Sequence, residues 1–150
     1  MRFVRFGIAT LTASLLIWLT SGIVLAQPPP PILVFSVNHS GTFDPHTGVA
    51  TISGTYTCTS TSLGTTFGVL LSLRQDTGRF TSSGFGGDTA DNTCDGAIHS
   101  WSADVSPQTG RFAGGQSTAS FTAQACEVVE GNCDRRFPVE TVQLRGGPPP

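Results

Sequence analysis

The chain has 150 residues, a formal net charge of −2 at pH 7, and a charged fraction of only 12%. Its basic residues are few and all are Arg, whereas nucleic-acid and anionic-lipid surfaces need clustered positive charge. We therefore expect neither a nucleic-acid-binding protein nor a protein attracted to membranes after export. The many Thr, Ser and Gly residues are typical of exported domains built from β-strands.

The first 26 residues have the organisation of a secretory signal peptide. Arg2 and Arg5 give a positive start, an apolar run follows, and Val24-Leu25-Ala26 suits a signal peptidase. We expect cleavage before Gln27 and a secreted or cell-surface location, with an uncleaved membrane anchor as the alternative. Without the first two arginines, six basic and ten acidic residues remain, so the mature chain is acidic.

Two proline-rich segments flank the rest of the chain, at residues 27–31 and 146–150. Consecutive prolines favour an extended polyproline II conformation, so we interpret these segments as a spacer and a tail. Residues 32–145 lie between them and are enough for one domain with a single core.

The predicted strands begin at residues 32–38, and the second of them, residues 49–58, alternates most strictly. Alternation over this length indicates a strand with one buried and one wet face. The inward set is Ala50, Ile52, Gly54, Tyr56 and Cys58.

Five further strands follow in chain order, and residues 82–96 are predicted to form a long loop because they are rich in Gly, Asp, Ser and Thr. Gly48, Gly78 and Gly110 each end a Thr-Gly pair, and we expect them to supply the positive φ of a turn. The further strands are 65–74, 79–85, 97–105, 117–125 and 137–145.

Four cysteines in an exported chain predict two disulfides. We favour Cys58 with Cys94 and Cys126 with Cys133, because the second pair is close enough to staple one loop. Zinc is the competing use of four cysteines, but the spacing contains no C-x-x-C pair.

Seven short strands without a convincing helical period predict an all-β fold. We expect an immunoglobulin-like antiparallel β-sandwich with Trp101 buried in its core. A jelly roll or a small barrel fits the strand count almost as well.

Two motifs carry a family resemblance: Gly54-Thr55-Tyr56-Thr57-Cys58, and Cys94-Asp95-Gly96 followed by His99-Ser100-Trp101. They resemble small secreted bacterial domains that are described as immunoglobulin-like and have no assigned function. This resemblance supports the pairing of Cys58 with Cys94. A weaker likeness is to the enediyne-carrying apoproteins of the neocarzinostatin type, whose first disulfide is local, so ligand carriage does not follow from it.

An acidic stretch in the predicted long loop is the first candidate site. Asp88, Asp91, Asn92 and Asp95 offer hard oxygen ligands of the kind that calcium prefers. Their spacing does not match an EF-hand loop, and polar loops are common in exported β-proteins. We therefore expect no metal and no cofactor, and treat these residues as a possible binding loop.

Catalysis has little support in the sequence. A nucleophile, a base and an orienting acid must converge, and no spacing here requires that. No serine stands in a G-x-S-x-G motif. His99 shares a predicted strand face with Trp101, which favours a half-buried structural histidine. We expect no enzyme and no catalytic residue.

The remaining expectation is a monomeric binding module for an unknown protein or glycan. One alternative is a small-ligand carrier with a cleft between two sheets. Another is a hydrolase inhibitor that presents Val128 and Val129 on the Cys126–Cys133 loop. The Arg135-Arg136 pair is a surface candidate of lower weight. Another is an aromatic patch at Phe80, Phe85 and Phe112, although we favour core packing for these three phenylalanines.

Overall fold

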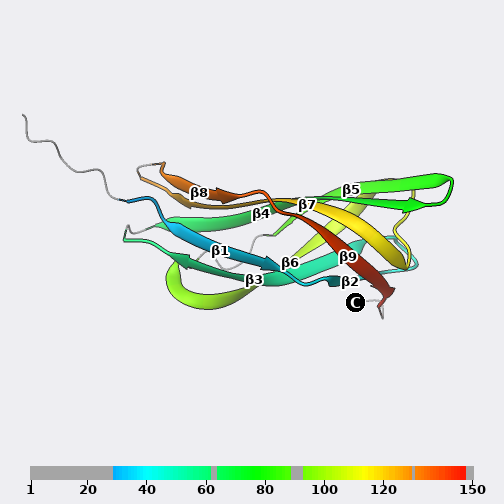
Figure 1. Cartoon of the computed structure of the whole chain (residues 1–150), viewed down its shortest axis with the longest axis horizontal. Coiled ribbons are helices and arrows are strands. Elements are labelled where there is room, and N and C mark those ends of the chain that lie inside the picture. Colours follow the sequence, from blue (N-terminus) through cyan, green and yellow to red (C-terminus); the bar gives the residue numbers. More distant parts are fainter. Residues whose placement is uncertain (1–28, 62–63, 89–92, 130, 148–150) are drawn as a thin grey trace, which may run out of the picture.

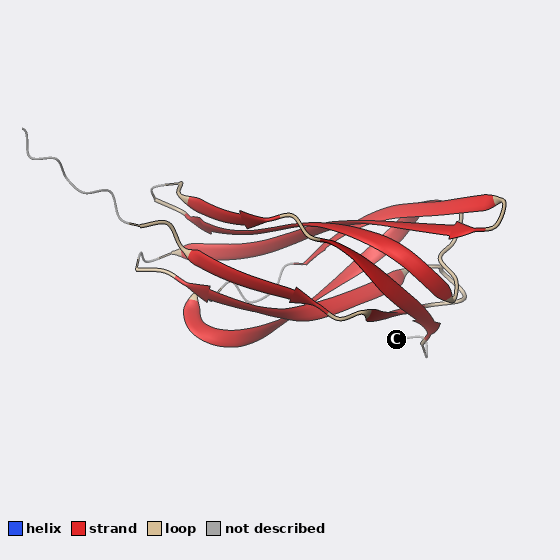
Figure 2. Cartoon of the chain, in the orientation of Figure 1, coloured by secondary structure: helices blue, strands red, loops and turns tan. Residues whose placement is uncertain are grey.

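The computed structural model describes residues 29–61, 64–88, 93–129 and 131–147. The expected signal peptide lies outside these residues. Within them the chain forms strands joined by short connections, as Figure 2 shows. The strands are β1 (Ile32–Val37), β2 (Ser40–Phe43), β3 (Ala50–Thr59), β4 (Thr65–Thr77), β5 (Phe80–Asp88), β6 (Asp95–Thr109), β7 (Gly115–Glu127), β8 (Cys133–Arg136) and β9 (Val139–Gly146).

The strands close into a seven-stranded barrel, so the predicted immunoglobulin-like sandwich is wrong. Pairing runs from β2 through β3, β6, β5, β4, β7 and β9 and returns to β2. The closing contacts are the β3–β6 ladder and the short parallel ladder between β2 and β9. β1 continues the β2 edge along β3, and β8 continues the β9 edge along β7 (Figure 1).

Two glycines explain why a predicted loop is a barrel strand. The predicted loop was 82–96, but residues 80–88 pair with β4, and residues 83–87 also pair with β6. A Cβ at Gly84 or Gly86 would collide with the main-chain oxygen of Ser106 or Asp104 on β6. Glycine therefore permits a close approach of two backbones here, which is one of its uses within strands.

The barrel interior is filled by apolar side chains from the alternating strands. The inward set predicted for residues 50–58 is confirmed, since Ala50, Ile52, Tyr56 and Cys58 are buried. Trp101 is also buried, as predicted, and its indole N–H donates to the carbonyl of Ser36 at 3.0 Å. The strands form one barrel wall and not two facing sheets, so the cleft between sheets that the small-ligand alternative assumed does not apply to this fold.

The two disulfides pair as predicted, Cys58 with Cys94 and Cys126 with Cys133. The first ties the end of β3 to the residue before β6, and the second ties β7 to β8. Two disulfides in a chain of this size are characteristic of compartments outside the reducing cytoplasm. The turn prediction is confirmed too, because Gly48, Gly78 and Gly110 have φ values of 75°, 66° and 65°.

Sequence reasoning missed β2 and β8. Each has only four residues, and Ser40-Gly41 has the composition of a turn. Both strands lie, with β1 and β9, along the line at which the barrel closes.

Candidate functional site

The barrel wall is incomplete along one line, which we call the seam: the space between β1 on one side and β8 with the start of β9 on the other. Gln143 donates its main-chain N–H to the carbonyl of His39 at 2.9 Å, and the β2–β9 ladder continues from there. Towards β8 the two edges are not joined by any ladder in the described part of the chain. The seam is therefore closed at one end by main-chain bonds and unpaired along the rest.

Side chains of β8 bridge the unpaired end of the seam. The main-chain N–H of Leu33 donates to Asp134 Oδ2 at 2.9 Å, and Arg136 Nε donates to the carbonyl of Leu33 at 3.1 Å. Arg136 also forms an ion pair with Asp134 at 2.8 Å. The two opposite charges thus neutralise each other while holding β1 in place.

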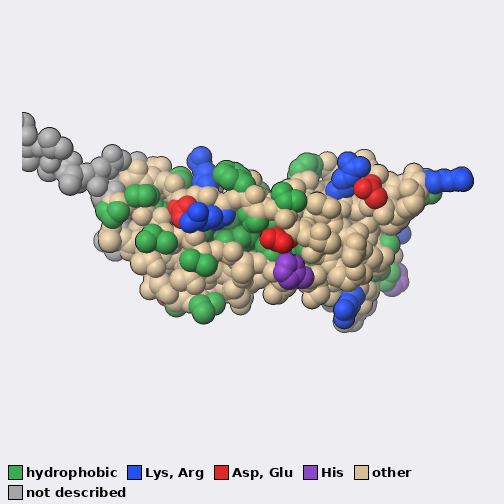
Figure 3. Space-filling view, viewed as in Figure 1, with side chains coloured by type: hydrophobic (Ala, Val, Ile, Leu, Met, Phe, Trp, Pro, Cys, Tyr) green, Lys and Arg blue, Asp and Glu red, His purple; other side chains and the backbone are tan. Residues whose placement is uncertain are grey.

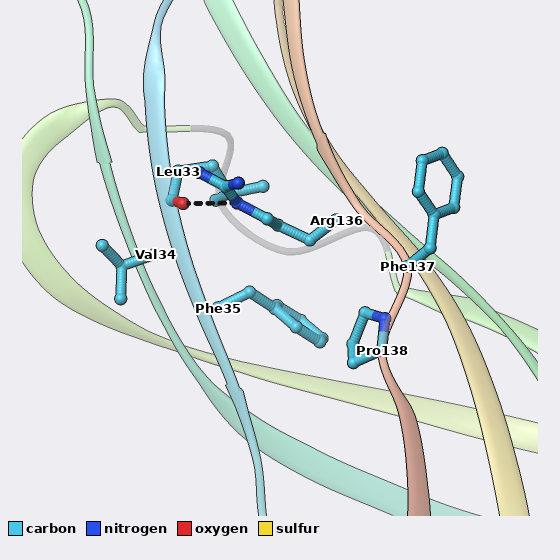
Figure 4. A pocket seen from close by; sticks show the side chains of 6 residues that line it. All are labelled: Leu33, Val34, Phe35, Arg136, Phe137 and Pro138. Carbon is cyan, nitrogen blue, oxygen red and sulfur yellow. Dashed lines mark hydrogen bonds between the residues drawn. The ribbon is translucent and has the colours of Figure 1, made fainter.

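A hollow of about 430 Å³ lies in the seam beside this bridge. In Figure 4, Arg136 reaches across the opening to Leu33, and Phe35 faces Pro138 below it. The Phe35 ring packs at 5.1 Å from Trp101 and 5.8 Å from Phe121, measured between ring centroids. The hollow therefore opens onto the aromatic core of the barrel.

Exposed apolar side chains lie on both strand edges of the seam. Four large ones are each between 62% and 67% exposed, Ile32, Val34, Phe137 and Val139, and two of them, Val34 and Phe137, line the hollow. Figure 3 shows hydrophobic side chains spread over the part of the face that β1 and β8 form. Exposed apolar side chains that gather around a hollow mark an interaction surface more often than isolated ones do.

A second hollow, of about 440 Å³, lies near the turn between β2 and β3. Its polar groups already bond one another: Thr47 Oγ1 donates to Asp44 at 2.8 Å, and Thr51 Oγ1 donates to Asp104 at 2.7 Å. Hydrogen bonds from the main-chain N–H of His46 and from Thr47 lower the pKa of Asp44. These groups are occupied within the β2–β3 turn and between β3 and β6, which makes the seam the stronger candidate.

Of the four residues of the predicted acidic loop, the structure describes Asp88 and Asp95. Asp88 accepts a hydrogen bond from the main-chain N–H of Ser102, and Asp95 accepts one from that of Ala97. Asp91 and Asn92 lie outside the described residues. Within the described ranges, no cluster of three or more His, Cys, Asp or Glu side chains is placed to hold a metal ion.

His99 and Asp95 form a close pair, with Nε2 and Oδ1 2.8 Å apart. This contact, with the N–H of Ala97, lowers the pKa of Asp95. The hydroxyl oxygen of Thr93 lies 3.5 Å from the same nitrogen of His99. In a hydrolytic triad the acid and the nucleophile bind opposite nitrogens of the imidazole. This geometry fits a structural histidine, whose ring stacks on Tyr56.

The other predicted surface residues are distributed over the molecule. Val128 and Val129 are 67% and 85% exposed in the β7–β8 connection. Phe80 and Phe85 are exposed, so core packing was the wrong interpretation for them, whereas Phe112 is buried. The three phenylalanines therefore form no common patch.

Sequence reasoning missed most of the seam. Arg136 was considered only with Arg135, as a surface pair that could dock an anionic partner or lie solvated, and Leu33, Phe35 and Pro138 only as strand residues. The usable signal was the spacing of Asp134 and Arg136, which places both side chains on one face of a strand that ends before Pro138. Without the register of β8 against β7, nothing linked that face to β1.

Fold and site together define the class: a small disulfide-bonded β-barrel with a laterally open seam and a filled core. The chain belongs to a family of unknown function (DUF6299), whose match covers residues 33–133. This agrees with the expected family of unassigned function but does not support the immunoglobulin-like or neocarzinostatin-type likeness. No curated protein matches the chain. The described residues contain no helix of the length and apolar character that crossing a membrane requires.

Proposed function

We propose that this domain is an exported, non-enzymatic binding module that contacts a protein partner at the seam. The observation that carries the proposal is the opening in the barrel wall, where exposed Val34 and Phe137 line the hollow and exposed Ile32 and Val139 lie on the same two strand edges. Protein interfaces have an apolar centre in which aromatic residues are enriched, and these side chains fit that description.

A protein partner fits this surface better than a glycan or a small ligand. Glycan sites rely on polar side chains that are free to bond hydroxyl groups, whereas Asp134 and Arg136 are occupied with each other and with Leu33. A carrier needs an enclosed apolar cavity that buries most of its ligand. The seam hollow instead lies open at the surface between two strand edges (Figure 4).

The expected location, outside the cell or at its surface, is part of the proposal. Its support is the predicted signal peptide together with the two disulfides. The non-enzymatic part rests on the geometry at His99, where the Asp95 carboxylate and the Thr93 hydroxyl lie beside the same ring nitrogen.

The test uses two matched phenylalanine variants of the full chain. Phe137 lies on the seam rim and Phe80 lies at the β4–β5 turn, and the two side chains are 67% and 76% exposed. Each is changed to Asp, and each variant is chemically cross-linked to extracellular proteins of the producing organism. A captured protein is then purified and its affinity is measured by calorimetry.

We expect the wild type and Phe80→Asp to bind the same purified partner with equal affinity. Phe137→Asp should bind at least about tenfold more weakly, because a charge would enter the apolar centre of the contact. Equal binding by both variants contradicts the proposal, as does a glycan partner.

A second candidate function, inhibition of a hydrolase, is favoured by the β7–β8 connection. Its two valines project from a loop closed by the Cys126–Cys133 disulfide. The main-chain N–H of Glu127 donates to the carbonyl of Asn132 at 2.9 Å, and that of Gly131 donates to the carbonyl of Glu127 at 3.0 Å. The buried Glu127 carboxylate also accepts from the Asn132 side chain. A rigid exposed loop of this kind suits an inhibitor.

The double change Val128→Asp with Val129→Asp tests this second candidate. It should leave the melting temperature unchanged and abolish inhibition of the target hydrolase in a panel of extracellular proteases and glycosidases. Inhibition that survives the double change contradicts the loop's role.

A further inference from the structure

At the seam, two side chains take the place of a neighbouring strand. A paired strand residue is offered one acceptor and one donor by the main chain beside it. Leu33 receives both from side chains, the acceptor from Asp134 and the donor from Arg136. At Leu33, the side chains of Asp134 and Arg136 therefore make the hydrogen bonds that a neighbouring strand would make. The bonds show that this edge of β1 can accept the donor and acceptor pattern of a strand.

The next main-chain pair on the same edge is that of Phe35. Along a strand, the N–H and C=O groups of every second residue point to the same side. Since those of Leu33 point into the seam, those of Phe35 do as well. The partner strand of Phe35 on its other side is β3, where it lies opposite Tyr56.

The opposite wall presents a matching pair. The carbonyl of Pro138 accepts from the main-chain N–H of Phe121 on β7 at 3.0 Å. By the same alternation, the N–H and C=O of Val139 point away from β7 and into the seam. Two strand edges therefore face each other across the hollow, and the main-chain groups of Phe35 and Val139 point into the seam between them.

We propose that the seam binds an extended polypeptide segment, which inserts between the two edges as an additional strand. Its main chain would bond Phe35 on β1 and Val139 on β9, each at the usual strand spacing of about 4.8 Å. This inference rests on the proposed function and names the form in which the partner binds. The barrel gains one strand when the segment is bound.

The lining sets the composition of the segment. Side chains of an inserted strand alternate between the barrel interior and the solvent. Inward ones meet the Phe35 ring and Pro138, so we expect apolar residues at every second position. Outward ones lie between Val34 and Phe137 on the rim, where apolar or small polar residues fit.

The test begins with a phage-displayed library of random heptapeptides, selected on the oxidised full chain. The most enriched peptide is synthesised, and its central amides are N-methylated one at a time to remove single main-chain donors. Affinities are measured by calorimetry for the wild type, Val139→Pro and Val139→Thr. Proline removes the main-chain N–H that faces the seam, whereas threonine keeps it with a similar side-chain shape.

We expect N-methylation of a central amide, and Val139→Pro, each to weaken binding by about tenfold, which is the effect of one lost hydrogen bond. Val139→Thr should stay within about twofold of the wild type. The melting temperature of Val139→Pro checks that the barrel is intact, since the changed N–H faces away from β7.

Three outcomes overturn the inference. Peptides that tolerate every N-methyl group would be bound through side chains alone. A library without any binder to the wild type excludes strand insertion. Binding of dodecanoate to the seam, lost in Phe137→Asp, would assign the hollow to acyl chains. Neither tolerance of N-methylation nor a library without binders decides whether a folded protein binds at the rim. The comparison of Phe137→Asp with Phe80→Asp decides that separately.

Discussion

The two disulfides should differ in how much they stabilise the barrel, and the difference follows from the chain each one closes. Cys58 and Cys94 are 36 residues apart, whereas Cys126 and Cys133 are 7 apart. In the loop-entropy account, a cross-link removes more disorder from the unfolded chain as the loop grows. With these separations that account gives about 3.8 kcal/mol for the long loop and about 2.4 kcal/mol for the short one.

The measurement is urea-induced unfolding of two double variants, Cys58→Ala with Cys94→Ala, and Cys126→Ala with Cys133→Ala. We expect the first to lose about 1.4 kcal/mol more free energy of unfolding than the second. Burial of Cys58 acts in the same direction, because its removal leaves a small cavity. Equal losses, or a larger loss for the short loop, would refute the reasoning.

Three further predictions concern packing and charge. Gly86→Ala should cost about 1 to 3 kcal/mol in urea unfolding, since its Cβ meets the main-chain oxygen of Asp104, whereas Gly68→Ala, with open space around it, should be nearly neutral. Trp101→Ala should cost roughly 3 to 5 kcal/mol because the ring is buried, and an exposed-indole fluorescence maximum in the wild type would contradict this. The lowered pKa of Asp44 means that its contribution to stability is present above the unfolded value of 3.8 and is lost as the pH falls through the lower folded value. Scanning calorimetry should therefore show a steeper decline of the melting temperature below that pH for the wild type than for Asp44→Asn.

Strand positions were largely predictable from the sequence, because alternation of apolar residues records which face is buried. The strands at 49–58 and 65–74 were found on this basis and appear as β3 and β4. Alternation does not record which strand lies beside which, and a sandwich and a barrel both bury one face of every strand. The prediction of a sandwich failed at that step.

The glycine-rich region after Phe80 shows the physical limit clearly. Glycine is common in loops because it is flexible, and it is also required in strands where two backbones approach closely. Composition alone does not separate these uses. At Gly84 and Gly86 the distinction depends on the carbonyls of β6, which are more than 15 residues away in the sequence.

The seam was unpredictable for a related reason. Asp134 and Arg136 look like ordinary charged residues near a disulfide, and their partner is the backbone of Leu33, about 100 residues earlier in the chain. Almost every residue has a main-chain donor and acceptor, so the residue type at position 33 does not indicate that its main chain is bonded by a side chain. Only the register of β8 on β7 shows that these side chains reach the edge of β1.

The seam also suggests how this fold can have an unpaired strand edge and still resist pairing with other chains. Unpaired strand edges invite uncontrolled pairing with other chains, and charged side chains that point into the edge are one protection against it. Here the Asp134–Arg136 pair covers the main-chain groups of Leu33, and the side chain of Phe35 faces Pro138 (Figure 4). Such an edge admits a segment narrow enough to enter between two strands and resists edge-to-edge pairing with a second barrel. The expected monomer and the proposed binding of an extended segment are both compatible with this arrangement.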